Sequence, residues 1–381
     1  MNIASVTRVV IVIGAALDES EALHAFSKHS RFIVTQVRVD EISSDPSVVN
    51  ADVIVVDIGA LGEEELEILT RVRAQVADAP LILISEALKP AAMRQILKFD
   101  IDDWLPKPVD VDGLFAAINN SVRTKRIRTN QVNAVVSCVG GAGATTVAIG
   151  MADLACQMLK KKNPNIALVD LDFSTGNCGY ALNMVSSFDL GSVAATPRRI
   201  DGEFLSVIQQ RHDAGFYLYS FKCPNINVEH GGFELILRLL DAVSLEHSTL
   251  FLDIPYYATE WRNDVFAAVN TCTLVSEVNL PAINQTLDVI QEIQELRGKD
   301  FPIHVIFNKH TRKLFGTRIS QRKLKELLGD TEFSFLPVDD SNIGEAIDRG
   351  VLLSEISGNS SFLRKLSKYV EQHDFLKAKA E

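Results

Sequence analysis

The chain has 381 residues, of which 47% are hydrophobic and 23% are charged, and its formal net charge is −11. This length predicts two domains, and this balance is typical of a folded globular protein rather than a disordered or fibrous chain. The negative charge argues against nucleic acid as a partner, because it repels a phosphate backbone.

Apolar runs alternate with helical patterns in the first third of the chain. Unbroken runs of Val, Ile and Leu are typical of strands buried on both faces, as in a parallel sheet between two layers of helices. The five runs lie at 8–14, 31–37, 52–58, 80–86 and 102–108. They predict a flavodoxin-like, doubly wound α/β domain over residues 1–122.

Three polar residues close the last three of these runs. Asp57 ends the third, Ser85 the fourth and Lys107 the fifth, at the sheet edge where such folds bind ligands. This pattern resembles a response-regulator receiver domain. The resemblance implies that Asp57 matches the phosphate acceptor, Ser85 the switch hydroxyl and Lys107 the lysine of that family, with Trp104 at the switch aromatic.

One departure from the receiver pattern changes the expected function. Receivers hold Mg²⁺ with an acidic pair after the first strand, whereas this chain has Gly14-Ala15 there and Asp18 lies too far along. Phosphoryl transfer to a carboxylate needs such a cation. We therefore expect an ion pair between Asp57 and Lys107 in a domain that serves as a docking platform; a phosphorylation-gated regulator is the alternative.

A basic stretch at 123–131 follows, and we interpret it as a linker between two independent sheets, with contact to an acidic surface as the alternative. The second domain then covers 132–381. It begins with an apolar strand, a glycine-rich turn and a helix, a combination that presents backbone N–H groups to an anion. Gly140, Gly141 and Gly143 allow this turn, and Thr145 lies where a Mg²⁺-binding hydroxyl belongs.

Further strands are predicted downstream, each followed by polar residues. The run at 166–172 ends in Asp170 and Asp172, the run at 248–255 contains Asp253, and the run at 304–310 ends in Asn308-Lys309. The chain therefore predicts two doubly wound, mainly parallel sheets, the second of the P-loop NTPase type.

The order of these motifs closely resembles the deviant Walker A ATPases of the MinD/ParA group, whose loop reads KGGxGKTT. Here Val139 replaces the signature lysine and Ala144 the phosphate-gripping lysine. The resemblance implies that ATP binds to the loop, that Mg²⁺ is held by Thr145, Asp170 and Asp253, partly through water, and that Asp172 positions the attacking water. The expected contacts to the nucleotide come from Gly140, Gly141, Ala142, Gly143, Ala144, Thr145, Thr146, Asn308 and Pro337.

Loss of both lysines should lower the rate of ATP hydrolysis more than it weakens ATP binding. A charge-assisted hydrogen bond contributes about 1.5–3 kcal/mol, so its loss weakens nucleotide binding by roughly 10- to 100-fold. Phosphoryl transfer depends mostly on electrostatic stabilisation, so we expect very slow ATP hydrolysis or none. A loop that has become a simple tight turn and binds nothing is the alternative.

A receiver-like half at 8–122 fused to an ATPase-like half at about 131–370 resembles the TadZ/CpaE family of Flp (Tad, type IVb) pilus assembly. The resemblance implies a cytoplasmic homodimer that recruits secretion and pilus machinery at a cell pole, with ATP as a structural ligand. An active ATPase that cycles in spatial positioning, at a cell pole or division site as in MinD and ParA, is the competing hypothesis.

Other patterns add less. The segment 361–379 is amphipathic, with an apolar stripe of Phe362, Leu363, Leu366, Val370 and Phe375. It resembles the membrane-binding helix of MinD, so a peripheral contact with the inner membrane surface is one interpretation. The favoured interpretation is that the stripe packs on its own domain. The five cysteines lack metal-binding spacing and predict reduced, buried thiols in a cytoplasmic protein. The eight histidines show no paired spacing and are expected to be surface or satisfied core groups.

Overall fold

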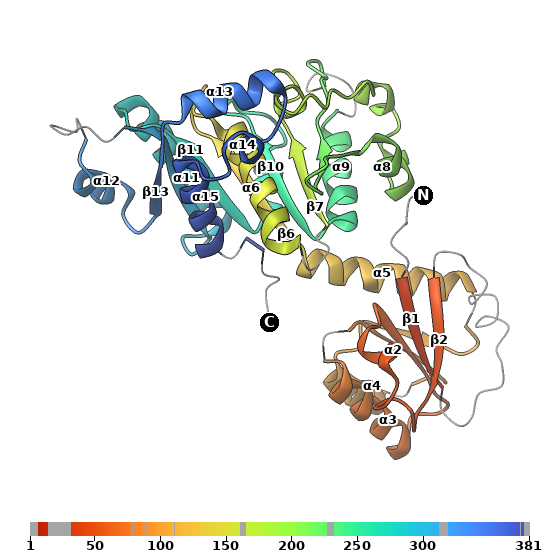
Figure 1. The fold of residues 1–381 in the computed structure, drawn as a ribbon. Helices are drawn as coiled ribbons and strands as arrows, with labels where there is room; N and C mark the ends of the chain where they lie inside the picture. The colour runs from red at the N-terminus through yellow and green to blue at the C-terminus, as the bar shows by residue number, and fades with distance from the viewer. Residues whose placement is uncertain are drawn as a thin grey trace. The chain divides into compact units, whose positions relative to one another are not determined.

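Buried runs of Val, Ile and Leu build two separate sheets in the computed structural model of the chain (Figure 1). These sheets belong to two compact units, Met1–Arg128 and Thr129–Glu381. The structure describes residues 7–13, 32–77, 79–88, 90–109, 111–160, 165–226, 232–311, 319–373 and 375–376. Among the described helices, none is long and apolar enough to cross a membrane.

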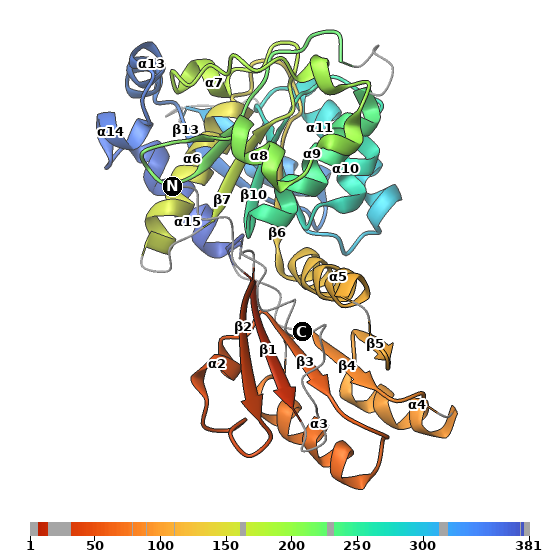
Figure 2. The same cartoon turned by 90° about the vertical axis from the view of Figure 1, so that its right-hand side faces the viewer.

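The first sheet has five parallel strands in the order β2-β1-β3-β4-β5, which is the flavodoxin-like order (Figure 2). The strands match the five apolar runs, so the predicted fold class is confirmed. They are β1 (Thr7–Ile13), β2 (Phe32–Arg38), β3 (Val53–Asp57), β4 (Leu81–Ser85) and β5 (Asp103–Pro106). The helices are α2 (Pro46–Val49), α3 (Glu63–Gln75), α4 (Pro90–Ile96) and α5 (Val111–Thr129), and a short 3₁₀ turn, η1 (Leu97–Phe99), follows α4.

Alternate side chains of each strand pack on opposite faces of this sheet. Val9 of β1 lies in one apolar cluster with Leu114 of α5, whereas Val10 lies in another with Leu69 and Val72 of α3. A strand flanked in this way on both sides needs apolar residues at every position, which is the pattern that the sequence shows.

The stretch expected as a linker is mostly helical. Helix α5 continues to Thr129, and the first strand of the second unit begins at Gln131. Arg and Lys favour helix, and no Gly or Pro interrupts the segment before Asn130. The two compact units therefore divide at the end of a helix rather than within an extended segment.

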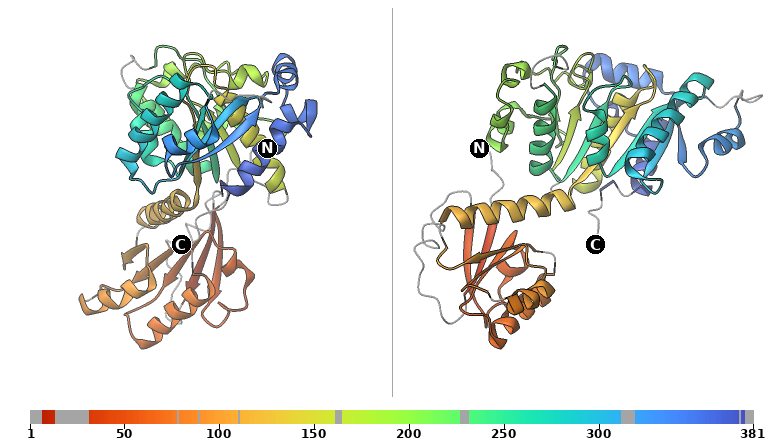
Figure 3. Two further views of the ribbon diagram at one scale, coloured as in Figure 1. Left: turned by 90° about the vertical axis from the view of Figure 1, so that its left-hand side faces the viewer. Right: turned by 180° about the vertical axis from the view of Figure 1, so that it is seen from behind.

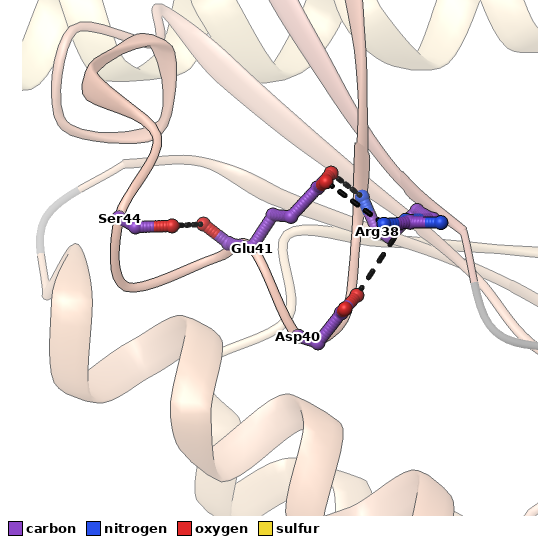
Figure 4. A network of polar contacts seen from close by, with 4 residues as sticks. All are labelled: Arg38, Asp40, Glu41 and Ser44. Atoms are coloured by element: carbon purple, nitrogen blue, oxygen red, sulfur yellow. Dashed lines mark hydrogen bonds and ion pairs between the residues drawn. The ribbon is translucent and has the colours of Figure 1, made fainter.

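A small polar network closes the turn after β2 (Figure 4). The Glu41 carboxylate accepts a hydrogen bond from Arg38 Nη2 at 3.1 Å, and Asp40 Oδ1 lies 3.7 Å from Arg38 Nε. Ser44 Oγ donates to the Glu41 carbonyl oxygen at 3.1 Å. These side chains are exposed, so their ion pairs contribute little stability. Their effect is to fix the turn at the same edge of the sheet as Asp57, because Arg38 and Asp57 are both in register with Ile13.

The second sheet has eight strands in the order β13-β12-β11-β6-β10-β7-β9-β8, all parallel except β8. They are β6 (Gln131–Ser137), β7 (Ile166–Asp170), β8 (Gln210–Arg211), β9 (Tyr217–Tyr219), β10 (Thr249–Ile254), β11 (Thr271–Ser276), β12 (Ile303–His310) and β13 (Glu332–Pro337). Strands β8, β9, β11 and β13 were not among the strands predicted from the sequence.

Helices cover both faces of the second sheet (Figure 3). One face packs against α8, α9, α10, α11 and α12, and the other against α6, α7 and α15. Their bounds are α6 (Ala144–Leu159), α7 (Cys178–Ala181), α8 (Gly202–Ile208), α9 (Gly232–Glu246), α10 (Arg262–Ala268), α11 (Leu280–Arg297), α12 (Gln321–Leu328), α13 (Asp340–Arg349), α14 (Leu353–Ser357) and α15 (Ser361–Gln372). Two short 3₁₀ turns, η3 (Leu190–Val193) and η4 (Pro197–Arg199), precede α8.

The apolar stripe of the C-terminal segment is buried. Phe362, Leu363, Leu366 and Val370 of α15 and the following Phe375 are at most 3% exposed and lie in one cluster with α6. The stripe packs on its own unit, as favoured, so it offers no apolar face to a lipid surface. The five cysteines are also buried, as expected, and no disulfide joins any two of them.

Candidate functional site

The glycine-rich loop connects the end of β6 to the start of α6, at the carboxyl edge of the second sheet. Gly141 and Gly143 have φ values of +78° and +88°, which glycine adopts without strain. A Cβ atom at Gly143 would also lie 2.6 Å from Asn308 Nδ2. In the described part of the chain the N–H groups of Gly141, Gly143 and Ala144 donate no backbone hydrogen bond, so they remain available to an anion.

A hydroxyl and three acidic or thiol groups meet beside this loop. Thr145 Oγ1 donates a hydrogen bond to Asp253 Oδ2 at 2.7 Å, and Cys178 Sγ lies 3.5 Å from the same oxygen. Asp253 and Asp170 are directly paired in register on the neighbouring strands β10 and β7. Parallel strands end at one edge, which is why residues so far apart in sequence converge here.

Burial dominates the electrostatics of this cluster. It raises the pKa of Asp253 to about 7 and that of Asp170 to about 6; the charge of Asp170 adds to the shift of Asp253, and the charge of Asp172 adds to the shift of Asp170. Asp170 already accepts hydrogen bonds from Ser220 Oγ, Asp172 N and Cys178 N. A divalent cation would offset this buried negative charge, and oxygen donors from Thr145 and Asp253 fit Mg²⁺. The donor set therefore fits the expected metal.

Asp172 is held in place by groups that the sequence analysis did not identify. Its Oδ1 accepts hydrogen bonds from Tyr257 OH at 2.6 Å and Thr175 N at 2.7 Å, and its Oδ2 accepts one from Thr175 Oγ1 at 2.7 Å. Burial and the Asp172 contact raise the pKa of Tyr257, which stays a neutral donor. Oδ2 accepts only the Thr175 contact among these, so it keeps an acceptor position that a water molecule can use.

Asn308 and Lys309 at the end of β12 both contact the loop backbone. Asn308 Nδ2 donates to the Ala142 carbonyl at 2.9 Å, and Lys309 Nζ donates to the Gly141 carbonyl at 2.6 Å. The sequence placed Asn308 in the site, but it gave Lys309 no role. Pro337 ends the neighbouring strand β13 and is paired with His310, so it lies at the same edge.

The two positions that lack lysine differ in their surroundings. Ala144 is 4% exposed and lines a cavity, whereas Val139 is partly buried and packs against the apolar cluster around α6. Tyr256, which is about half exposed, covers the loop, because a Cβ at Gly140 would lie 3.4 Å from its ring. None of the described residues that line the cavity is Lys or Arg.

The cavity has a volume of about 570 Å³ and extends well beyond the loop. One end is polar and holds the loop, Thr145, Thr146, Asp172 and Asp253. The other end is apolar and is formed by α6, α13, α14 and α15, with Ile149, Ile343, Leu352 and Phe362 among its lining residues. The predicted loop and acidic residues are thus brought together at one end of a larger hollow.

In the first unit, Lys107 Nζ lies 2.8 Å from Asp57 Oδ1, and the Asp57 side chain is 3% exposed. Burial raises the pKa of Asp57, and the lysine acts against this shift. Ser85 Oγ accepts a hydrogen bond from Trp104 Nε1 at 2.9 Å. The expectation that this unit lacks the acidic pair of receivers rests on Gly14, Ala15 and Asp18. These three residues lie outside the described residues.

Comparison with solved structures identifies the second fold. A ParA family ATPase from Chlorobium tepidum TLS matches with a TM-score of 0.56 at 16% identity, over 64% of this chain and 98% of that one. The apo form of McdA from Cyanothece matches with a TM-score of 0.50 at 17% identity, over 64% of this chain and 98% of that one.

The chain contains the fold of ParA family ATPases. At these identities the likeness covers fold alone, and the matched share is comparable with the size of the second unit. Comparisons with protein-family models and with curated protein sequences find no match. The ParA-type fold agrees with the broader part of the resemblance noted in the sequence.

Proposed function

We propose that this protein is a localisation and scaffold factor that binds ATP with Mg²⁺ at the glycine-rich loop and hydrolyses it very slowly or not at all. The contact between Thr145 and Asp253 carries this proposal. It places a hydroxyl and a buried carboxylate beside a loop with open N–H groups, although both loop lysines are missing.

The residues of the site have separate roles in this function. The loop N–H groups bind phosphate oxygens, and Thr145 and Asp253 hold Mg²⁺, which neutralises phosphate charge when bound. Asn308 and Lys309 fix the loop carbonyls, so the loop keeps the shape that an anion requires. Asp172 is held in place by Tyr257 and Thr175.

Weak catalysis follows from the charges around the loop. Phosphoryl transfer requires positive groups at the transferring oxygens, and the loss of one such group costs orders of magnitude in rate. Positions 139 and 144 supply none, and no Lys or Arg lines the described cavity. Binding and chemistry are therefore separated, and ATP acts as a structural ligand.

The biological setting that we propose is Flp (Tad, type IVb) pilus assembly. Its support is the order of a flavodoxin-like unit followed by a ParA-type unit, which resembles the TadZ/CpaE family. In this setting the protein is a cytoplasmic homodimer at a cell pole that recruits secretion and pilus components. A fluorescent fusion that is diffuse in cells, with pilus assembly unaffected by deletion of the gene, contradicts the setting.

Calorimetric titration of ATP and Mg²⁺ into the full chain, with the mass measured by light scattering at both end points, tests the biochemical core. We expect saturable binding and a shift to a dimer, with negligible phosphate release over hours. An absence of heat up to millimolar ATP with an unchanged mass refutes nucleotide binding. Rapid turnover instead favours the competing function, an ATPase that cycles in spatial positioning, for which the ParA-type fold itself is the favouring observation.

A further inference from the structure

We propose that His304, Glu332 and His373 form a binding site for a divalent transition-metal ion of the Zn²⁺ class, separate from the nucleotide site. His304 lies on β12, Glu332 begins β13, and His373 follows the last residue of α15. The three side chains offer ligand atoms that all lie within 4.8 Å of one another. This proposal does not depend on nucleotide binding.

The distances among these side chains fit one metal ion. Glu332 Oε2 lies 3.7 Å from Nδ1 of His304 and 3.7 Å from Nδ1 of His373. Ligand atoms at tetrahedral angles with bonds of about 2.0–2.2 Å are about 3.3–3.6 Å apart. Two of the three separations are only slightly longer than this, and the third, between the two histidines, is at most 4.8 Å.

The gap between Glu332 and His304 is too long for a hydrogen bond, so the carboxylate does not already satisfy Nδ1 of His304. Nδ1 of His304 is buried and has no hydrogen-bond partner among the described residues. A buried polar atom without a partner carries a desolvation cost, and a metal ion at this point would offset it.

The donor set selects the class of metal. Imidazole nitrogens suit Zn²⁺ and its neighbours, whereas Mg²⁺ and Ca²⁺ prefer oxygen ligands. Two histidines and one glutamate leave a fourth tetrahedral position for water.

Aromatic side chains fix the two imidazoles. The ring centroids of His304 and His373 are 3.9 Å apart, and the rings of Tyr369 and Phe375 lie within 6.2 Å of both. Tyr369 is itself hydrogen-bonded to Thr273 Oγ1 at 2.8 Å. Glu332, in contrast, has a side chain that is 70% exposed, so an ion can reach the cluster from solvent.

Metal binding at this position ties the end of α15 to the strands β12 and β13. Helix α15 packs against α6, since a Cβ atom at Gly150 would lie 2.7 Å from Leu366. Helix α6 in turn begins at the glycine-rich loop. The ion would therefore stabilise the layer of helices that contains α6 and α15, on one face of the second sheet.

The test is titration of Zn²⁺ into the full chain, followed by calorimetry, with millimolar Mg²⁺ present to occupy the carboxylate site. We expect one saturable site whose affinity falls by about 10-fold or more in E332Q and in H373Q. Zn²⁺ should also slow hydrogen exchange in peptides that contain α15 and β13 of the wild type, but not of E332Q. Glu332 is exposed, so E332Q should fold normally.

Two control variants separate this site from others. C178S removes the thiol of the Asp170–Cys178–Asp253 cluster and should leave Zn²⁺ binding unchanged. H212Q removes a histidine that stacks on Phe216, away from the cluster, and should also bind normally. Absence of saturable Zn²⁺ binding by the wild type, or equal affinity in wild type, E332Q and H373Q, overturns the proposal.

Discussion

The ammonium group of Lys309 donates a hydrogen bond to the carbonyl oxygen of Gly141 at 2.6 Å and lies 3.3 Å from Glu277. Lys309 comes from the end of β12, with a φ of +52°, and not from the loop itself. A loop that has Val139 and Ala144 at its two lysine positions is therefore contacted by a lysine from another strand. This lysine fixes the backbone of the loop and is paired with Glu277, and it does not line the described cavity.

We expect K309M to weaken ATP binding by about 10-fold, because one charge-assisted hydrogen bond at the loop is lost. Calorimetric titration of Mg²⁺-ATP into wild type and variant measures the change. The matched control is E277Q, which removes the ion pair but leaves the contact with Gly141. Equal ATP affinity of K309M and wild type would show that the contact between Lys309 and the loop does not contribute to ATP binding.

A second prediction concerns the missing phosphate-gripping lysine. A144K places an ammonium group at the first position of α6, on the cavity wall. We expect ATP to bind about 10- to 100-fold more tightly than in wild type, through a new charge-assisted contact to phosphate. A144M, of similar length but uncharged, is the control. If both variants bind ATP with equal affinity, the loop does not bind the phosphates of ATP next to position 144, and the proposed function loses its main support.

Most strands could be predicted because they are continuous Val, Ile and Leu runs, but β11 was missed for a physical reason. Its polar Thr271, Thr273 and Ser276 interrupt the apolar pattern. Each is satisfied by a distant group: Thr271 donates to Asn133, Thr273 bonds Tyr369, and Ser276 accepts from Thr286. Such partners lie on other elements, so local sequence does not reveal that Thr273 and Ser276 are buried.

The same limit applies to the site. Thr145 and Asp253 were predictable because each follows a recognisable strand, and the carboxyl ends of parallel strands share one edge. The contact of Tyr257 with Asp172 depends on the path of the chain after Pro255, which has no sequence pattern. Among the described elements, one strand and four helices (α12, β13, α13, α14 and α15) separate His304 from His373, so their proximity exists only in the folded chain.

The third prediction concerns the pair Asp57–Lys107. K107M leaves the Asp57 carboxylate buried without its cation and should destabilise the first unit by about 2 kcal/mol, less than for a fully buried pair because Lys107 is partly exposed. The double variant D57N/K107M should recover more than half of this loss. Hydrogen exchange of peptides from β3 and β5 measures both changes. A double variant no more stable than K107M contradicts a structural role for the pair.

The last prediction concerns pH. His247 is 3% exposed, its Nδ1 faces Asn165 Oδ1 at 2.7 Å, and its Nε2 faces Tyr219 OH at 2.8 Å. Burial lowers its pKa from 6.5 to about 4. Between these values the unfolded chain binds a proton that the folded chain does not, so stability falls as the pH falls from 6.5 towards 4.

H247Q removes the imidazole that binds this proton, so the free energy of unfolding should depend less on pH. Between pH 7 and pH 5, wild type should lose about 2 kcal/mol more free energy of unfolding than H247Q. The chain has two tryptophans, so in a W104F background the buried Trp261 reports urea unfolding of the second unit. Other titrating groups are common to both proteins and cancel in the comparison. Parallel pH profiles would mean that His247 binds its proton equally well in the folded and the unfolded chain.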